Sequence, residues 1–405
     1  MTETRRARRY LARAAAAIIA VSLPGIYAIQ QSLQQRRATQ SSDAEKRGLA
    51  EPFKGITTDG SVTAGLFPVR STGVSTAPVQ QAADAFLKAL SPEQRTRTVF
   101  KEDDDEWRKW MNQHFYVRQG VSFQDMTEAQ REVSLRPPAR LPERQGAAAL
   151  AGHHAPEPHT LGELNSDNFE EYGEWLYHLT VMGTPSANEP WGWQLDGHHL
   201  IVNYFVLGDQ VVMTPLFVGS EPVTATAGKY KGTSILQDEQ AAGLAMVQAL
   251  DGAQKARAIL QPSKAGNNNL TEAFKDNVVL EYAGVRASEL PGAQREQLTA
   301  LIQLFVDNMK EGHARVRMSE VRAHLDETRF AWVGATDPGA VFYFRIQSPV
   351  ILIEFDHQRP ANLRHLAKDP QAPTREHIHV VVRTPNGNDY GKDLLRQHYR
   401  QHPHK

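Results

Sequence analysis

Two β-strands and the turn between them are indicated by one stretch of the chain, Trp191-Gly-Trp-Gln-Leu-Asp-Gly-His-His-Leu200, and by the apolar residues that follow it up to Val206. Aromatic and β-branched residues favour strands, and Asp196-Gly197 is a typical hairpin turn. Neighbouring segments at 175–182 and 210–218 have the same β-rich character. We therefore expect an antiparallel meander in this part of the chain.

A second β block lies near the end of the chain. Its segments are 330–334, 340–347, 350–355 and 377–383, with turn signals at Asp337-Pro338-Gly339 and Ser348-Pro349. Helical patterns of apolar residues occupy 238–260 and 293–310, between the blocks, and another starts at Pro78. This order predicts an α+β fold with a mixed, largely antiparallel sheet from both β blocks and helices packed around it. No fixed-period repeat is visible, so we expect neither a solenoid nor a propeller.

The composition limits the architecture and the partners. A chain of 405 residues can form one large or two ordinary domains, and the order of the elements favours a single domain over 77–400. With 45 basic and 46 acidic side chains the formal charge is −1, so we expect no nucleic-acid partner. The chain has no cysteine, so any metal must be held by nitrogen and oxygen ligands.

The amino terminus, residues 1–29, is typical of an export signal or a signal anchor. Arg8-Arg9-Tyr10-Leu11-Ala12 resembles a twin-arginine pattern, and an apolar stretch, Ala14 to Ile29, follows it. An ordinary Sec signal is the alternative. Cleavage after Ala28 would place Ile26 at a position where signal peptidase prefers small residues, so a retained anchor also stays open. We expect an extracytoplasmic protein, periplasmic or secreted, with a polar spacer at 30–76 and membrane contact only through an uncleaved N-terminal segment.

Two histidine pairs are candidate metal ligands. His377 and His379 open a β-branched run, and residues two apart in a strand share a face, so both imidazoles can point at one ion. His198 and His199 are expected on opposite faces of a strand, so at most one of them joins that pair. Three histidines would leave an open coordination position for zinc or copper. Polar groups on a solvated strand face are the alternative.

Acidic and polar residues near these histidines are candidates for further roles. Glu354 and Asp356 share a strand face and are the candidate catalytic residues, as a general base or as partners that orient a ligating histidine. Ion pairs with Arg345 or Arg383 are the alternative. The candidate substrate-binding residues are Arg383, Arg345, Asn203 and Trp193, although a core position explains Trp193 equally well.

Several common catalytic motifs are missing from the sequence. It contains no Gly-rich phosphate loop, no Gly-x-Ser-x-Gly elbow and no His-Glu-x-x-His helix. Nucleotide-dependent chemistry and the common serine hydrolases are therefore disfavoured.

The motifs together resemble a known family. They are the Trp191–Leu200 stretch, Tyr343-Phe-Arg-Ile-Gln347, Ile353-Glu-Phe-Asp356, His377-Ile-His379, Asp389-Tyr-Gly391 and Asp393-Leu-Leu395. The resemblance is to the bacterial and fungal domain-of-unknown-function family number 3500, and it runs from about Pro78 to Tyr399. It supports the domain limits and the choice of motifs, and it implies no reaction. The separation of the acidic strand from the second histidine pair, residues 357–376, is longer than the family leads us to expect.

We therefore predict an exported metal-dependent enzyme that acts on a small neutral or anionic molecule. His377, His379 and His198 or His199 would hold zinc or copper, and a zinc-activated water would make the protein a hydrolase. A copper-dependent oxidoreductase is one alternative. A non-catalytic extracytoplasmic protein that binds a small ligand is another, and a structural surface protein is a third.

Overall fold

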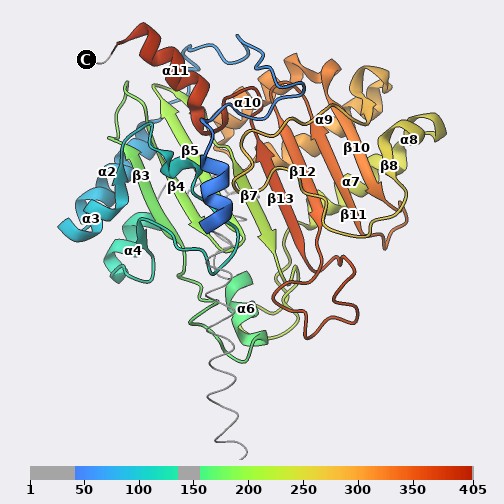
Figure 1. Ribbon diagram of the computed structural model, residues 1–405, viewed down its shortest axis with the longest axis horizontal. Helices are drawn as coiled ribbons and strands as arrows, with labels where there is room; N and C mark the ends of the chain where they lie inside the picture. The colour runs from blue at the N-terminus through green and yellow to red at the C-terminus, as the bar shows by residue number, and fades with distance from the viewer. Residues whose placement is uncertain (1–41, 136–155, 404–405) are drawn as a thin grey trace, which may run out of the picture.

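One sheet of thirteen strands runs through the part of the chain that the computed structural model describes, residues 42–135 and 156–403. In chain order its strands are β1 (Val99–Phe100), β2 (Val121–Ser122), β3 (His178–Gly183), β4 (Trp191–Gly197), β5 (Leu200–Leu207), β6 (Gln210–Val212), β7 (Leu216–Ser220), β8 (Ile259–Gln261), β9 (Val285–Arg286), β10 (Arg329–Gly334), β11 (Phe342–Gln347), β12 (Leu352–His357) and β13 (Ile378–Arg383). Across the sheet they lie in the order β1-β3-β4-β5-β7-β13-β12-β11-β10-β8, and β2, β6 and β9 pair with β3, β5 and β10 (Figure 1). Most pairs are antiparallel, so the predicted α+β fold is confirmed.

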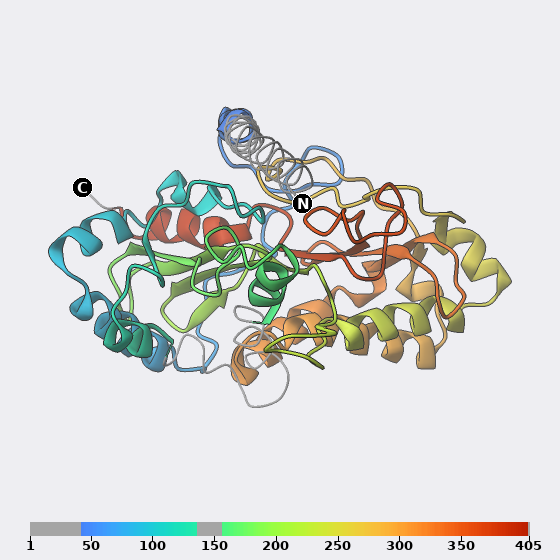
Figure 2. The same cartoon turned by 90° about the horizontal axis from the view of Figure 1, so that it is seen from below.

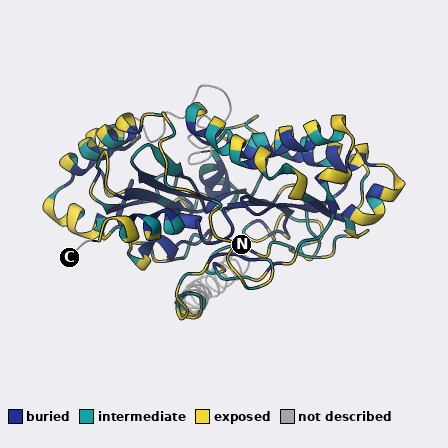
Figure 3. Ribbon diagram, turned by 90° about the horizontal axis from the view of Figure 1, so that it is seen from above, coloured by how far each residue is buried: buried dark blue, intermediate teal, exposed yellow. Residues whose placement is uncertain are grey.

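Helices surround the sheet. They are α2 (Ala77–Ala89), α3 (Pro92–Thr98), α4 (Glu128–Leu135), α6 (Pro156–Leu164), α7 (Gln237–Ala249), α8 (Gly252–Ala258), α9 (Gly292–Val306), α10 (Glu311–Ala323) and α11 (Lys392–Gln401). Helices α7 and α9 lie on one side of the sheet and α11 on the other (Figure 2). The strands between these layers are buried, while the outer faces of the helices are exposed (Figure 3).

The two faces of the sheet carry different side chains because successive residues of a strand point to opposite sides. On β13, Ile378, Val380 and Val382 join the large apolar core that contains residues of α2, α7, α9 and α10. The other face of β13 carries His379, Val381 and Arg383. Val381 belongs there to a second apolar cluster with Phe217, Trp110 and Tyr390. The candidate site lies on this second face.

The sheet consists of two structurally equivalent halves. In the first half β1 is parallel to β3, and an antiparallel series β3-β4-β5-β7 follows; in the second half β8 is parallel to β10, and β10-β11-β12-β13 follows. The strand registers also correspond. Gln194 of β4 pairs with Asn203 of β5, and at the equivalent position in the second half Arg345 of β11 pairs with Glu354 of β12. The halves meet where β7 pairs with β13 (Figure 1). This repetition shows no period in the sequence because equivalent positions hold different residues.

Two local features differ from the sequence-based expectation. Asp196 and Gly197 belong to β4, and the chain turns at His198 and His199, because Gly197 pairs directly with Leu200. His199 has a positive φ of 58°, a backbone conformation that histidine adopts more readily than most residues. The predicted strand at 210–218 is divided into β6 and β7.

The stretch for which the composition predicts a polar spacer is partly packed on the domain. Residues 42–49 are helical, and Ile56 and Phe67 are buried in apolar clusters. These two side chains remove apolar surface from water, which accounts for the packing of this otherwise polar segment. The predicted export segment, residues 1–29, lies outside the described residues. No helix within the described ranges has the length and apolar character needed to cross a membrane.

Candidate metal centre

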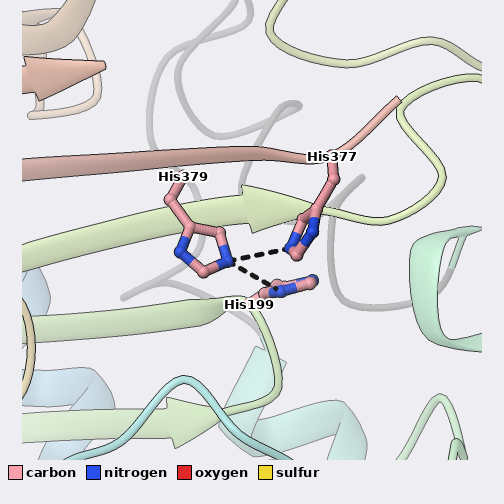
Figure 4. Close-up of side chains that lie close together, drawn as sticks. All are labelled: His199, His377 and His379. Atoms are coloured by element: carbon pink, nitrogen blue, oxygen red, sulfur yellow. Dashed lines mark hydrogen bonds between the residues drawn. The ribbon is translucent and has the colours of Figure 1, made fainter. Parts of the chain in front are cut away.

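Three imidazoles meet on the second face of the sheet. His199 comes from the β4–β5 turn, His377 directly precedes β13, and His379 lies in it. The Nε2 of His379 is 3.0 Å from the Nε2 of His377 and 3.2 Å from the Nε2 of His199 (Figure 4). All three residues are buried. The sequence prediction that one histidine of the first pair joins both of the second is therefore matched by the geometry.

The outer nitrogen of each ring is held by an acceptor. The Nδ1 of His199 lies 3.0 Å from Glu157, that of His379 lies 2.7 Å from Glu272, and that of His377 lies 2.6 Å from the carbonyl oxygen of Arg359. Carboxylate and carbonyl oxygens only accept hydrogen bonds, so each Nδ1 is the donor. Such contacts fix the ring and raise the basicity of the other nitrogen, as is usual for histidines that bind metals.

The inner nitrogens then have no proton to share. A neutral imidazole carries one N–H, and here it is at Nδ1. Burial lowers the pKa of His377 and of His379, which favours the neutral form of both, although Glu272 opposes the shift at His379. Without a cation between them, the lone pairs of the three Nε2 atoms would repel one another. Nitrogens bound to one tetrahedral zinc ion at about 2.0–2.1 Å lie roughly 3.3 Å apart, close to the separations observed. The group can hold a metal ion.

Two buried carboxylates, Glu157 and Glu221, and the partly exposed Glu272 surround the imidazoles and make the surroundings negative. Burial would raise the pKa of Glu157, but His198 and His199 lower it to about 2. Burial likewise opposes ionisation of Glu272, and His379 lowers its pKa below the ordinary value. The carboxylate of Glu221 accepts backbone N–H groups from residues 361–363 and lies 3.9 Å from the Nδ1 of His377. Within the described ranges, none of these three carboxylates forms a salt bridge with a lysine or an arginine. Their negative charge therefore favours the binding of a cation among the imidazoles.

The backbone beneath the rings leaves little room for a side chain at Gly219. Gly219 of β7 pairs with His379, and a Cβ there would lie 2.9 Å from the carbonyl oxygen of Ile378, 3.0 Å from Cδ2 of His199 and 3.2 Å from Cδ2 of His379. Any larger residue would push the two rings apart. The ring of Phe217 lies next to them, with its centroid 5.0 Å from that of His379. It closes one side of the site with an apolar wall.

His198 does not face away from the other histidines. Its ring stacks on that of His199, with centroids 4.0 Å apart and planes inclined by 25°. The two residues form a tight turn rather than part of a strand, which is why they lie on the same side. The Nδ1 of His198 is 3.6 Å from Glu157, which also groups these two histidines with that carboxylate.

The predicted catalytic carboxylates lie beside the site and are fully engaged elsewhere. Asp356 pairs with Lys264 at 2.5 Å and accepts the N–H groups of Asn268 and Asn269. Glu354 accepts hydrogen bonds from Leu270, Thr271 and Tyr343. Both therefore anchor residues 264–276, which we call the strap, and Lys264 replaces the arginine partners expected from the sequence. The role of orienting a ligating histidine, considered for Asp356, falls to Glu272 of the strap.

The predicted substrate-binding arginines also have structural contacts. Arg383 is buried and donates to Asp276, Asp389 and backbone carbonyls of the strap through all of its nitrogens. Arg345 donates to the carbonyl oxygen of Glu281. Neither guanidinium lies among the contacts of the three imidazoles, so the structure does not bring these two residues to the site.

Asn203 and Trp193 occupy interior positions. Asn203 accepts a hydrogen bond from Gln194 and donates one to the carbonyl oxygen of Pro215, so its amide is satisfied within the sheet. Trp193 stacks on Tyr204 at 5.1 Å in the apolar core of the opposite face. The core interpretation of Trp193 is therefore the one the structure favours.

Sequence reasoning missed the residues that support the imidazoles. Glu157, Glu272 and Gly219 lie outside every motif singled out, and the fourth support is a backbone carbonyl, at Arg359, which any residue can supply. The longer separation at 357–376 was a usable signal, because this loop contains Arg359 and the N–H groups that Glu221 binds.

Fold and site together define an α+β protein with a buried three-histidine centre that can hold a metal ion. A comparison with protein families matches residues 72–392 to the family described as protein of unknown function (DUF3500), and the chain belongs to this family. No curated protein and no solved structure matches the chain in the corresponding searches. The family description names no reaction, so the function has to be argued from the site.

Proposed function

We propose that the protein is a metal-dependent enzyme whose metal is held by His199, His377 and His379. The observation that carries the proposal is the convergence of three Nε2 atoms within 3.0 and 3.2 Å while each Nδ1 is bound to an acceptor. Histidines that only satisfy a polar core would not need to direct three lone pairs at one point.

The ligand set favours zinc and hydrolysis. Three neutral imidazoles leave the full charge on the ion and a fourth position open, which is the arrangement of catalytic rather than structural zinc sites. An ion of this kind lowers the pKa of a bound water to about 7 and so supplies a nucleophile at neutral pH. Glu157 and Glu272 would hold the ligand rings, and Phe217 would restrict access of bulk water. Imidazole also suits copper, so the alternative is a copper-dependent oxidoreductase.

The burial of the three rings favours a small substrate. His199, His377 and His379 are each exposed by 6% or less. A macromolecule could not reach an ion at this depth without large rearrangements, whereas a small, polar or anionic molecule could occupy the open position. We propose a small-molecule substrate on this ground.

Metal analysis of the purified, tag-free protein tests the proposal. We expect about one equivalent of zinc or copper, and its loss from the His377→Ala, His379→Ala double variant. A double variant of two other histidines, His324→Ala and His365→Ala, is the matched control and should keep the metal. Absence of metal from a correctly folded wild-type protein, even after incubation with zinc or copper, would reject the enzyme and leave a small-ligand binding protein as the better description. A protein that contains copper and no zinc would favour the copper-dependent oxidoreductase.

We also propose that the protein acts outside the cytoplasm. The support is the sequence Arg8-Arg9-Tyr10-Leu11-Ala12 followed by an apolar stretch, which is typical of proteins exported through the twin-arginine route. Fractionation of cells that express the full chain, compared with an Arg8→Lys, Arg9→Lys variant, tests this proposal. Recovery of both proteins from the cytoplasm alone would contradict it.

A further inference from the structure

His198 is the member of the two histidine pairs that the three-nitrogen cluster does not use. We propose that it is a catalytic residue, whose Nε2 accepts the proton of a water molecule in the open coordination position. This inference rests on the proposed function, since it requires an ion at His199, His377 and His379.

The orientation of the His198 ring follows from a shared carboxylate. The rings of His198 and His199 are stacked, and both turn Nδ1 towards Glu157, at 3.6 Å and 3.0 Å. In each ring Nε2 lies across from Nδ1. Both Nε2 atoms therefore point to the side opposite Glu157, which for His199 is the side of the metal centre.

The distance between the two rings places the Nε2 of His198 beside the proposed ion, where it is not a ligand. The ring centroids of His198 and His199 are 4.0 Å apart and their planes are inclined by 25°, so the ring of His198 lies beside the plane of His199. An ion about 2.0–2.1 Å from the Nε2 of His199 lies in the plane of that ring, and the stacked ring of His198 is displaced from it. A water bound to such an ion on the side of His198 would lie next to this ring, where a hydrogen bond to Nε2 needs a separation of roughly 2.6–3.2 Å.

The surroundings of His198 keep its Nε2 available as an acceptor. Nδ1 of His198 faces the carboxylate of Glu157 at 3.6 Å, which favours the proton of a neutral His198 at Nδ1 and leaves a lone pair at Nε2. The side-chain amide of Asn362, 3.4 Å away, can donate to this Nε2, which is consistent with an acceptor at that position. On the outer side the ring is covered by His114, edge to face at 5.6 Å, and by Tyr172.

The proposed step balances without another reactant. As the oxygen of the water attacks a carbonyl or phosphoryl centre of the substrate, its O–H bond breaks and an N–H bond forms at Nε2 of His198. The electron pair of the broken bond stays on oxygen and forms the new bond. The bond between that centre and the leaving group then breaks with its electron pair on the leaving group, to which the protonated imidazole, stabilised by Glu157, returns the proton.

Azide binding to the cobalt-substituted full chain tests the contact with the bound water. Azide displaces the water but donates no hydrogen bond. His198→Phe removes the acceptor that stabilises the bound water, so azide should displace this water more easily. We expect the Kd of azide to fall roughly tenfold, which is the effect of one hydrogen bond. His198→Gln, which offers an amide oxygen, should restore the wild-type Kd. His114→Phe, a change of the same kind on the outer side of His198, should have no effect.

Hydrolysis of 4-nitrophenyl acetate by the zinc-loaded protein tests the proton transfer. We expect kcat to fall by about 10²-fold or more in both His198→Phe and His198→Gln with KM unchanged, because neither side chain accepts a proton. If both variants hold near one equivalent of metal, an azide Kd unchanged in His198→Phe, or a kcat unchanged in both variants, would overturn the role of His198 and leave the metal centre intact. Loss of the metal from His198→Phe would make His198 a ligand instead. A wild-type protein without metal would remove the proposed function itself.

Discussion

Glu272 and His379 are joined by a contact of 2.7 Å although they are 107 residues apart in the chain. Glu272 belongs to the strap, and the strap is fixed to the sheet by Asp356, Glu354 and Arg383. The charged residues beside the three imidazoles therefore act on the proposed metal centre indirectly, by holding the segment whose Glu272 contacts His379.

Replacing Glu272 should weaken the metal site without removing a ligand. In Glu272→Gln the amide can still contact His379, but it lacks the negative charge that makes the ring more basic. We expect zinc affinity, measured by competition with a chromophoric chelator, to fall by about 10–100-fold. Glu311→Gln on the exposed surface of α10 is the control and should bind zinc as the wild type does. Equal affinities in the two variants would show that Glu272 does not support the site.

Breaking the ion pair between Lys264 and Asp356 should destabilise the fold. Both side chains are fully buried, so Lys264→Met leaves an uncompensated carboxylate in the interior. We expect a loss of about 3–5 kcal/mol in the free energy of unfolding, measured with urea on the metal-free protein. The double variant Lys264→Met, Asp356→Leu removes both charges and should recover part of this loss. If the single variant is as stable as the wild type, the pair does not anchor the strap.

Adding one methyl group at Gly219 should disturb the three imidazoles. The new Cβ of Gly219→Ala would meet a backbone oxygen at 2.9 Å and the His199 ring at 3.0 Å, so the ring must shift. We expect zinc affinity to drop by more than tenfold and the free energy of unfolding to fall by about 1–3 kcal/mol, as is usual for overpacking. Gly252→Ala is the matched control, because a Cβ at that position meets no atom within 4 Å. Full zinc affinity in Gly219→Ala would contradict the tight packing beneath the rings.

Acid should destabilise the protein partly through His357. This residue accepts the N–H of Phe342 at 2.8 Å, and burial, with a smaller contribution from Arg375, lowers its pKa to about 3. Between pH 6.5 and 3 the unfolded chain binds a proton here that the folded chain does not. The contribution of His357 is therefore fully present above pH 6.5 and is lost as the pH falls towards 3, by up to about 1.4 kcal/mol per pH unit.

The variant His357→Asn isolates this contribution. Its Oδ1 can accept the Phe342 N–H but does not titrate in this range. In urea unfolding of the metal-free proteins at a series of pH values, the stability of the variant should fall less steeply below pH 6.5 than that of the wild type. Parallel curves would mean that His357 is not the group responsible.

Sequence patterns were sufficient where a local rule determines the structure. The alternation of apolar residues in β12 and β13 and the spacing of His377 and His379 gave the strands, the fold class and two of the three converging imidazoles. The predicted position of the β4–β5 turn was wrong by two residues. Asp-Gly is a frequent turn sequence, but Gly197 pairs with Leu200, so the turn lies at His198 and His199.

The remaining part of the site depends on contacts that no local pattern encodes. Glu157 and Glu272 reach their histidines from a helix and a strap that are distant in the chain, and only the assembled sheet brings them together. Asp356 and Glu354 were correctly placed near the site, but their partners, Lys264 and the N–H groups of the strap, come from a stretch without a recognisable motif.

The two equivalent halves of the sheet contribute unequal numbers of histidines to the proposed metal centre. His199 belongs to the first half, and His377 and His379 belong to the second, so an ion bound by all three crosslinks the halves next to the β7–β13 pairing. Neither half on its own can complete the coordination. Metal binding at the proposed site would in this way be coupled to cooperative folding of the entire sheet, and partial unfolding of either half would release the ion.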